Sequence, residues 1–148
     1  MFADKLIEKV LQCKNHSVIG LDPRAEYIPE HILQEEASEI KSEGFENERA
    51  ELMARAFLRF NKEIIDNTYD IVPAVKPQIA FYEQYGIAGF RCFLETCEYA
   101  RSKGMLVIGD VKRGDIGSTA EAYSDFYLGD NDYSAATDCI TVNPYLGT

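Results

Sequence analysis

The chain has 148 residues, of which 46% are hydrophobic and 27% are charged. This length and composition are those of one globular domain or of part of a larger one, and they exclude a disordered chain. With 15 Lys and Arg against 25 Asp and Glu, the net charge is −10, which argues against a nucleic acid or an anionic membrane as a partner. A small phosphorylated substrate remains compatible, because a few local cations suffice to hold it.

Targeting and metal-binding patterns are not found. No apolar run approaches the roughly 20 residues that span a bilayer, and the N-terminus lacks the apolar core of a signal peptide, so we expect a cytoplasmic protein. His16 and His31 have no companion at metal-ligand spacing, so no metal site is expected. The four cysteines form no C-x-x-C pair, and we expect reduced core residues: Cys13, Cys92, Cys97 and Cys139.

Helical and strand patterns alternate along the chain. Apolar spacing predicts helices at residues 2–14, around 52–65 and at 87–103, the last of which stops at Gly104. Start and stop signals predict two more helices, one from Pro29 to Gly44 and one that begins at a capping box formed by Ser118 and Glu121. Short apolar runs predict strands at 17–21, 71–75, 105–111 and 139–142. This alternation implies an α/β fold with parallel strands. Two architectures fit, an open doubly wound sheet and the first half of a (β/α)8 barrel.

Ionisable residues stand at the ends of three predicted strands. Side chains two positions apart share a face of a strand, which places Asp110 and Lys112 together on the third strand. By the same rule Asp22 and Lys76 extend the apolar faces of the first two strands. Each residue alone could be an ordinary turn or surface residue, and so could Asp115 in the following loop. The same placement on three strands favours a site, because α/β enzymes carry their chemistry at the carboxyl ends of parallel strands.

The charges of this cluster alternate in sign and would keep one another ionised. A lysine between carboxylates stays protonated, which suits a proton donor better than a Schiff-base nucleophile. A carboxylate beside a substrate anion would destabilise the ground state.

Four motifs give the chain a family resemblance. Asp110, Lys112, Asp115, Ile116 and Thr119 match the D-x-K-x-x-D-I-x-x-T signature of orotidine 5′-phosphate decarboxylase. The longer run D-V-K-R-G-D-I-G-S-T-A-E-A-Y resembles the bacterial subfamily, which also carries G-L-D-P-R, V-K-P-Q and T-V-N-P-Y. These motifs stand at residues 20–24, 75–78 and 141–145.

The resemblance implies a (β/α)8 TIM barrel that converts orotidine 5′-monophosphate to UMP and CO2, the last step of de novo pyrimidine synthesis, without a metal or an organic cofactor. Lys112 would protonate C6 as CO2 leaves, and Asp110 would lie beside the scissile carboxylate. Lys76 would connect the ribose hydroxyls to Asp110, and Asp22 would bind a ribose hydroxyl.

The resemblance also implies a homodimer with shared active sites, in which Asp115, Ile116 and Thr119 reach the site of the partner subunit. Members of this family are longer than this chain, and their phosphate-binding and pyrimidine-binding residues lie on later strands. We therefore expect residues 1–148 to form the N-terminal half of a single (β/α)8 barrel domain, with about four βα units. Two alternatives stay open: a magnesium-dependent sugar-phosphate decarboxylase that shares D-x-K-x-x-D, and a non-catalytic half-barrel.

Overall fold

The computed structural model describes residues 1–40 and 47–146 of the chain. Its helices are α1 (Phe2–Cys13), α2 (Glu30–Glu39), α3 (Glu48–Asp66), α4 (Ala80–Glu83), α5 (Gly86–Ser102) and α6 (Gly117–Leu128), with a short 3-10 helix, η1, at Ala25–Tyr27. Its strands are β1 (Val18–Leu21), β2 (Ala74–Pro77), β3 (Leu106–Arg113) and β4 (Cys139–Val142). The predicted alternation of helices and strands is confirmed, and the short α4 and η1 are additions to it.

The four strands form one parallel sheet in the order β1-β2-β3-β4. A doubly wound sheet reverses its strand order at a switch point, whereas a barrel adds each new strand on the same side. The described strands show no such reversal, so the doubly wound alternative is wrong. The sheet has the strand order of half a (β/α)8 barrel.

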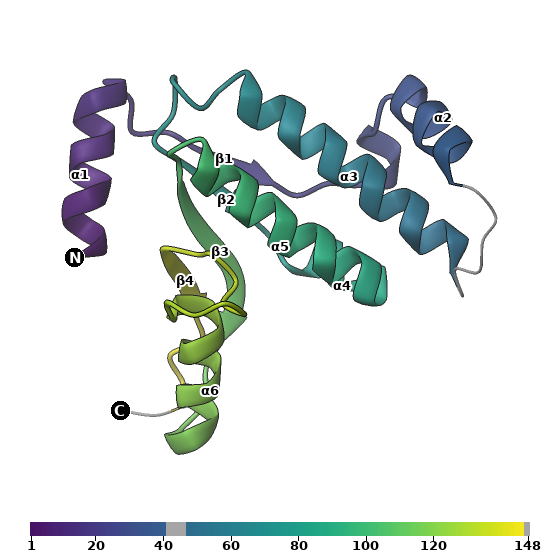
Figure 1. The fold of residues 1–148 in the computed structure, drawn as a ribbon. Helices are drawn as coiled ribbons and strands as arrows, with labels where there is room; N and C mark the ends of the chain where they lie inside the picture. The colour runs from purple at the N-terminus through teal and green to yellow at the C-terminus, as the bar shows by residue number, and fades with distance from the viewer. Residues whose placement is uncertain (41–46, 147–148) are drawn as a thin grey trace.

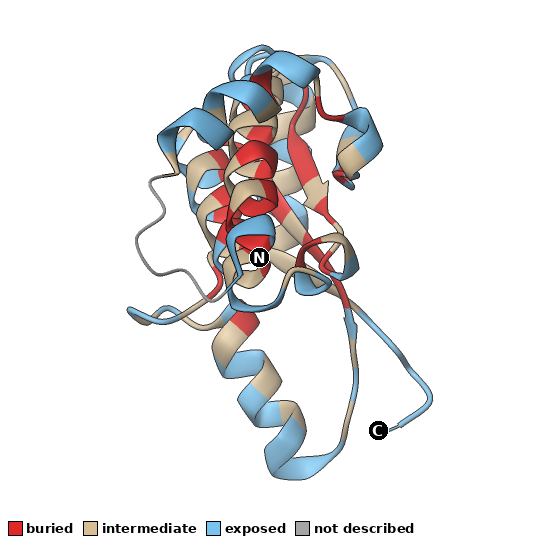
Figure 2. Ribbon diagram, turned by 90° about the vertical axis from the view of Figure 1, so that its right-hand side faces the viewer, coloured by how far each residue is buried: buried red, intermediate tan, exposed pale blue. Residues whose placement is uncertain are grey.

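The core lies between the sheet and the helices. Leu21, Val75 and Val107 alternate with the site-facing residues of β1, β2 and β3 and are at most 1% exposed. Helices α3 and α5 pack side by side and supply Phe57 and Phe93, which are fully buried (Figure 1). Figure 2 shows the buried residues concentrated in this layer, while α6 is mainly exposed. One face of the sheet is therefore covered by helices, and the polar side chains at the ends of the strands lie on the other face.

The second strand begins later than its sequence predicts. Residues 71–75 were predicted as strand, but the N–H groups of Ile71 and Val72 donate to the Thr68 carbonyl in the turn that follows α3. Pro73 has no N–H to offer a ladder. The strand therefore starts at Ala74 and continues through Lys76 to Pro77.

Two helix boundaries also differ from the predictions. The capping box is wrong, because α6 begins at Gly117 after an extended Ile116, so that Ser118 lies in the first turn and makes no cap hydrogen bond. Pro29 precedes α2 as its N-cap rather than opening it as first residue. The predicted stop at Gly44 lies outside the described residues. Gly104 does end α5, with a left-handed φ of 79°.

The cysteines are all free, and burial raises the pKa of the Cys92 thiol to about 12. Cys92 and Cys97 are core residues as predicted, whereas Cys13 and Cys139 are only half-buried. No helix of residues 1–40 and 47–146 has the length and apolar composition needed to cross a membrane.

Candidate active site

The carboxyl ends of β1, β2 and β3 place polar side chains on one face of the sheet. The register pairs Gly20 with Lys76 and Ala74 with Leu106, and an isolated bridge pairs Gln78 with Asp110. Paired residues of parallel strands point to the same face. The predicted common face for Lys76 and Asp110 is therefore confirmed by the register.

Asp110 is the centre of the cluster. The Lys112 ammonium donates to Asp110 Oδ1 at 2.6 Å, and the Lys76 ammonium donates to Oδ2 at 3.0 Å. The Asp110 side chain is 10% exposed, whereas those of Lys76 and Lys112 are 35% and 62% exposed. A buried carboxylate thus faces two ammonium groups that remain accessible to a ligand.

Two uncharged side chains complete the surroundings of Asp110. Gln78 Nε2 donates to Oδ2 at 2.9 Å, and the Thr141 hydroxyl donates to Oδ1 at 2.8 Å. Sequence reasoning did not assign either residue to the site. The strand periodicity that located the charges could have found both, because Gln78 follows Lys76 by two positions and Thr141 lies one position before the end of β4.

This environment holds Asp110 ionised. Burial by itself raises the pKa of this carboxyl, but hydrogen bonds from Lys112, Lys76 and Thr141 outweigh it and lower the pKa to about 2. Asp110 therefore carries a full negative charge at neutral pH. The arrangement presents one buried anion and two cations to whatever binds at the strand ends.

Asp22 lies at the end of β1, and its side chain is exposed. Asp22 Oδ1 lies 3.5 Å from the point where a Cβ of residue 20 would stand. The Asp22 carboxylate is therefore close to Gly20, which pairs with Lys76 in the sheet. Within the described residues it makes no side-chain hydrogen bond to the Asp110 cluster. Asp22 is thus near the predicted site but free to contact a ligand.

Asp115, Ile116 and Thr119 do not join the cluster. Asp115 Oδ1 accepts the Ile116 N–H at 2.8 Å, a local bond that shapes the loop between β3 and α6. Ile116 is 60% exposed, and Thr119 is exposed in the first turn of α6. Asp115 lines a groove of about 710 Å³ that runs between α6 and β4. These three residues are available to a second molecule and do not touch Asp110.

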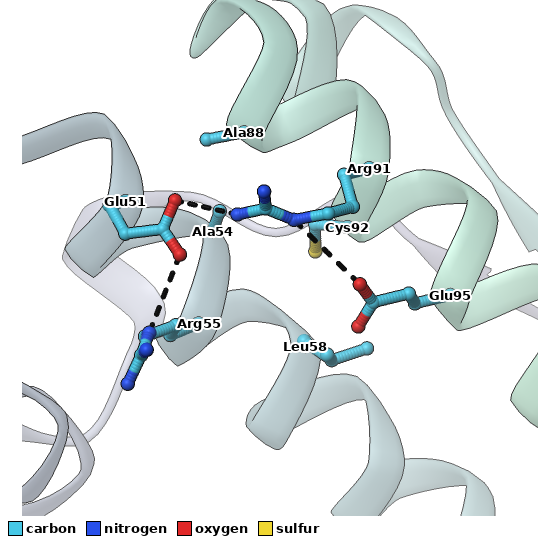
Figure 3. Close-up of a pocket in the computed structure, with 8 residues that line it drawn as sticks. All are labelled: Glu51, Ala54, Arg55, Leu58, Ala88, Arg91, Cys92 and Glu95. Atoms are coloured by element: carbon cyan, nitrogen blue, oxygen red, sulfur yellow. Dashed lines mark hydrogen bonds and ion pairs between the residues drawn. The ribbon is translucent and has the colours of Figure 1, made fainter. Parts of the chain in front are cut away.

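A separate pocket of about 310 Å³ lies between α3 and α5 and shares no residue with the Asp110 cluster. There Arg91 donates to Glu51 at 2.6 Å and lies 3.8 Å from Glu95, while Arg55 contacts the other oxygen of Glu51 at 3.4 Å (Figure 3). The two arginines and two glutamates balance in charge. This network ties the two helices together and offers no unpaired group for chemistry.

Metal ligands do not gather in the described part of the chain, where no three His, Cys, Asp or Glu side chains are placed to hold an ion. The ionisable side chains that contact the Asp110 carboxylate are the two ammonium groups of Lys76 and Lys112, which occupy its oxygens and would repel a cation there.

The amino-acid sequence of the chain is similar to those of several known enzymes. The chain is 45% identical over 148 residues to an orotidine 5′-phosphate decarboxylase of Clostridium perfringens and 42% identical over 147 residues to that of Petrotoga mobilis. Each alignment covers 99% of this chain and 45% of the relative, so the chain spans less than half the length of these relatives.

The solved structure of Leishmania donovani OMP decarboxylase aligns with a TM-score of 0.66 and 28% identity, over 97% of this chain and 44% of that one. Orotidine 5′-phosphate decarboxylases are TIM barrels, and the four βα units correspond to about half of such a barrel. A sequence model described as "Orotidine 5'-phosphate decarboxylase / HUMPS family" matches residues 18–148. The chain therefore belongs to the orotidine 5′-phosphate decarboxylase / HUMPS family.

Proposed function

We propose that this chain forms the N-terminal half of a (β/α)8 barrel enzyme that decarboxylates orotidine 5′-monophosphate to UMP and CO2. The observation that carries the proposal is the Lys76–Asp110–Lys112 cluster, in which both oxygens of a buried carboxylate accept bonds from accessible ammonium groups. The names of the relatives support the choice of substrate.

The reaction breaks the bond between C6 and the carboxylate carbon, and the bonding electron pair stays on C6. The Lys112 ammonium donates its proton to C6, and the carboxylate departs as CO2. Lys112 suits this role because it is charged and 62% exposed. The developing negative charge at C6 is stabilised by a cation already in place, so little reorganisation is needed.

Asp110 contributes by repelling the substrate carboxylate. Two like charges about 4 Å apart at an effective dielectric of about 20 repel by about 4 kcal/mol. Enzymes lower barriers by roughly 8–23 kcal/mol, so this repulsion supplies only part of the effect. The larger share falls to the ammonium of Lys112.

Substrate binding falls to residues around this pair. Lys76 bridges Asp110 and the ribose hydroxyls, for which its 35% exposure leaves room. Asp22 accepts a hydrogen bond from a ribose hydroxyl with its exposed carboxylate. No cofactor is needed, since the proton donor and the repelling charge are side chains of the chain itself.

The protein acts as a cytoplasmic homodimer with shared active sites. Asp115, Ile116 and Thr119 extend from the loop and first turn after β3, and each contacts the substrate bound at the site of the partner subunit. Their position beyond the end of β3, without contact to Asp110, and the exposure of Ile116 and Thr119 support a contribution to a second molecule. The acidic net charge of −10 fits a small-molecule substrate better than a nucleic acid.

The decisive experiment measures decarboxylation of orotidine 5′-monophosphate by the full-length purified protein, followed as loss of substrate absorbance with UMP identified as product. Activity that disappears in Lys112→Ala supports the proposal. A full-length protein that is folded but releases no CO2 from this substrate contradicts it.

A sugar-phosphate decarboxylase or synthase is the second candidate, because the matching family model covers both branches of the family. That candidate would require a magnesium ion, whereas the first candidate requires none. Orotidine 5′-monophosphate decarboxylation that survives EDTA supports the first candidate. Activity on a sugar phosphate that EDTA abolishes supports the second.

A further inference from the structure

The backbone of Lys112 has a conformation that is rare within a strand. Its φ is 48°, in the left-handed region that residues with a Cβ seldom adopt. The two other described non-glycine residues with positive φ, Lys14 and Ala136, lie outside strands. Lys112 therefore needs a specific partner that holds it in this conformation.

A bulge in β3 creates the need for this partner. Gly109 pairs with Ile140 and Arg113 pairs with Val142, so three residues of β3 face the single residue Thr141 of β4. Such an insertion displaces backbone groups from the ladder. The Lys112 N–H is one of them, and it donates to the Thr141 hydroxyl oxygen at 3.0 Å.

The same hydroxyl also binds the carboxylate. Thr141 Oγ1 donates to Asp110 Oδ1 at 2.8 Å, and that oxygen also accepts the Lys112 ammonium at 2.6 Å. Thr141 thus connects the backbone end of Lys112 to the carboxylate that holds its side-chain end. Only a group that both accepts and donates a hydrogen bond can occupy this position, and a hydroxyl does both.

We propose that Thr141 is a positioning residue of the active site, whose hydroxyl holds Lys112 in its left-handed conformation and thereby aims the ammonium for proton transfer. The inference rests on the proposed function of Lys112 as proton donor. Without the hydroxyl, the Lys112 N–H loses its partner, and the backbone relaxes to negative φ. The ammonium then leaves its place beside Asp110.

The test compares three variants in the full-length protein. Thr141→Val removes the hydroxyl at nearly constant shape, Thr141→Ser keeps the hydroxyl, and Thr68→Val removes a hydroxyl bonded to the Ile64 carbonyl far from the site. Misplacement of a catalytic group by about 1 Å costs on the order of a hundredfold in rate. We expect kcat to fall by about tenfold to a hundredfold in Thr141→Val, with a smaller change in KM. Thr141→Ser should restore most of kcat, and Thr68→Val should leave it unchanged.

Two readouts separate positioning from loss of stability. A crystal structure of Thr141→Val should show Lys112 at negative φ, and hydrogen exchange of the Lys112 amide should accelerate. The acid limb of the plot of kcat against pH should move to higher pH, because Asp110 loses the Thr141 hydrogen bond, one of the bonds that lower its pKa. The other charged groups around this carboxylate, Lys76 and Lys112 in contact and Asp22 at the neighbouring strand end, are unchanged in the variant. If Thr141→Val does not fold, Thr141→Ala serves for the same measurements.

The outcomes are distinct. Thr141→Val with native kcat, or with an unchanged positive φ at Lys112, overturns the positioning role. An equal loss of kcat in Thr141→Val and Thr68→Val also overturns it. A native protein that does not decarboxylate orotidine 5′-monophosphate refutes the proposed function instead, and the φ and exchange measurements still decide what Thr141 does to Lys112.

Discussion

Lys112 Nζ lies 2.6 Å from Asp110 Oδ1, although only one residue separates the two along β3. Neighbours on one face of a regular strand extend side by side and hold their end groups apart. Here the bulge and the left-handed Lys112 backbone bring the ammonium back over the carboxylate. The Lys112 ammonium and the Asp110 carboxylate, the proposed proton donor and repelling charge, are thus fixed relative to each other before any substrate binds.

Removal of the ammonium should therefore abolish turnover without unfolding the protein. We expect Lys112→Ala to lower kcat of the full-length enzyme by at least a hundredfold, because general acid catalysis contributes roughly 10²–10⁴-fold. Circular dichroism and the melting temperature check that the fold is retained. Lys62→Ala, on α3 beside Tyr99, is the control for loss of a surface lysine. Retention of more than about a hundredth of the native rate would refute the role of Lys112.

The charge of Asp110 should make stability depend on pH in acid. Its folded pKa of about 2 lies below the usual 3.8, so its ionisation stabilises the folded state above about pH 4 and this contribution is lost as the pH falls through 2. The shift corresponds to roughly 2 kcal/mol. We expect the difference in unfolding free energy between the native protein and Asp110→Asn to shrink by about this amount from pH 5 to pH 2, in urea titrations. Asp130→Asn, at an exposed position, controls for the change in net charge. A difference that stays constant with pH would contradict the assignment.

Subunit mixing tests the shared site. Lys112→Ala and Asp115→Ala proteins are each expected to be inactive, and a mixed dimer holds one site with both defects and one with neither. After random exchange half of the dimers are mixed, so about a quarter of the native activity should return. Mixing Lys112→Ala with Asp110→Ala is the control and should restore nothing, since both residues belong to the same subunit's half of the site. No recovery in the first mixture, with exchange verified by mass spectrometry, would argue against a shared site.

A buried polar cluster joins α3, α4 and α5 to the end of β1. The Tyr82 hydroxyl donates to the Leu21 carbonyl at 3.1 Å and accepts from Asn61 Nδ2 at 3.0 Å. Burial raises the pKa of Tyr82 well above 10, so the hydroxyl remains a donor. Tyr82→Phe should lower the unfolding free energy by about 1–3 kcal/mol, because it removes two buried hydrogen bonds, each worth about 0.5–1.5 kcal/mol.

Chemical denaturation measures this loss. Tyr69→Phe is the matched control, since Tyr69 is 45% exposed. A Tyr82→Phe protein within ~0.5 kcal/mol of the native one would show that the cluster does not hold the end of β1 in place.

The positions of β1, β3 and β4 and the common face of Asp110 and Lys76 could be predicted from the sequence. Both follow from strand periodicity, which depends only on residues close together in the chain. Asp22 followed from the same rule, although its ligand contact remains a prediction.

The features of the fold and of the site that could not be predicted depend mainly on pairing between segments far apart in the sequence. The bulge opposite Thr141 arises from the register of β3 against β4, which no local pattern specifies. Gln78 and Thr141 obey the periodicity but carry no charge, so the pattern of ionisable residues does not indicate them. The start of β2 was misplaced because the apolar pair Ile71 and Val72 resembles a strand, whereas its N–H groups bind the turn after α3. The proposed role of Asp115 depends on a second subunit, which the sequence of one chain does not describe.

Among the described residues, the side chains that donate to the Asp110 carboxylate come from β2, β3 and β4 and the residue after β2. Lys76 and Gln78 precede it by 34 and 32 residues, and Thr141 follows it by 31. During synthesis at roughly 5–20 residues per second, these groups are added within about 3–13 s of one another. The charge cluster can therefore assemble on the nascent chain as soon as β4 pairs with β3.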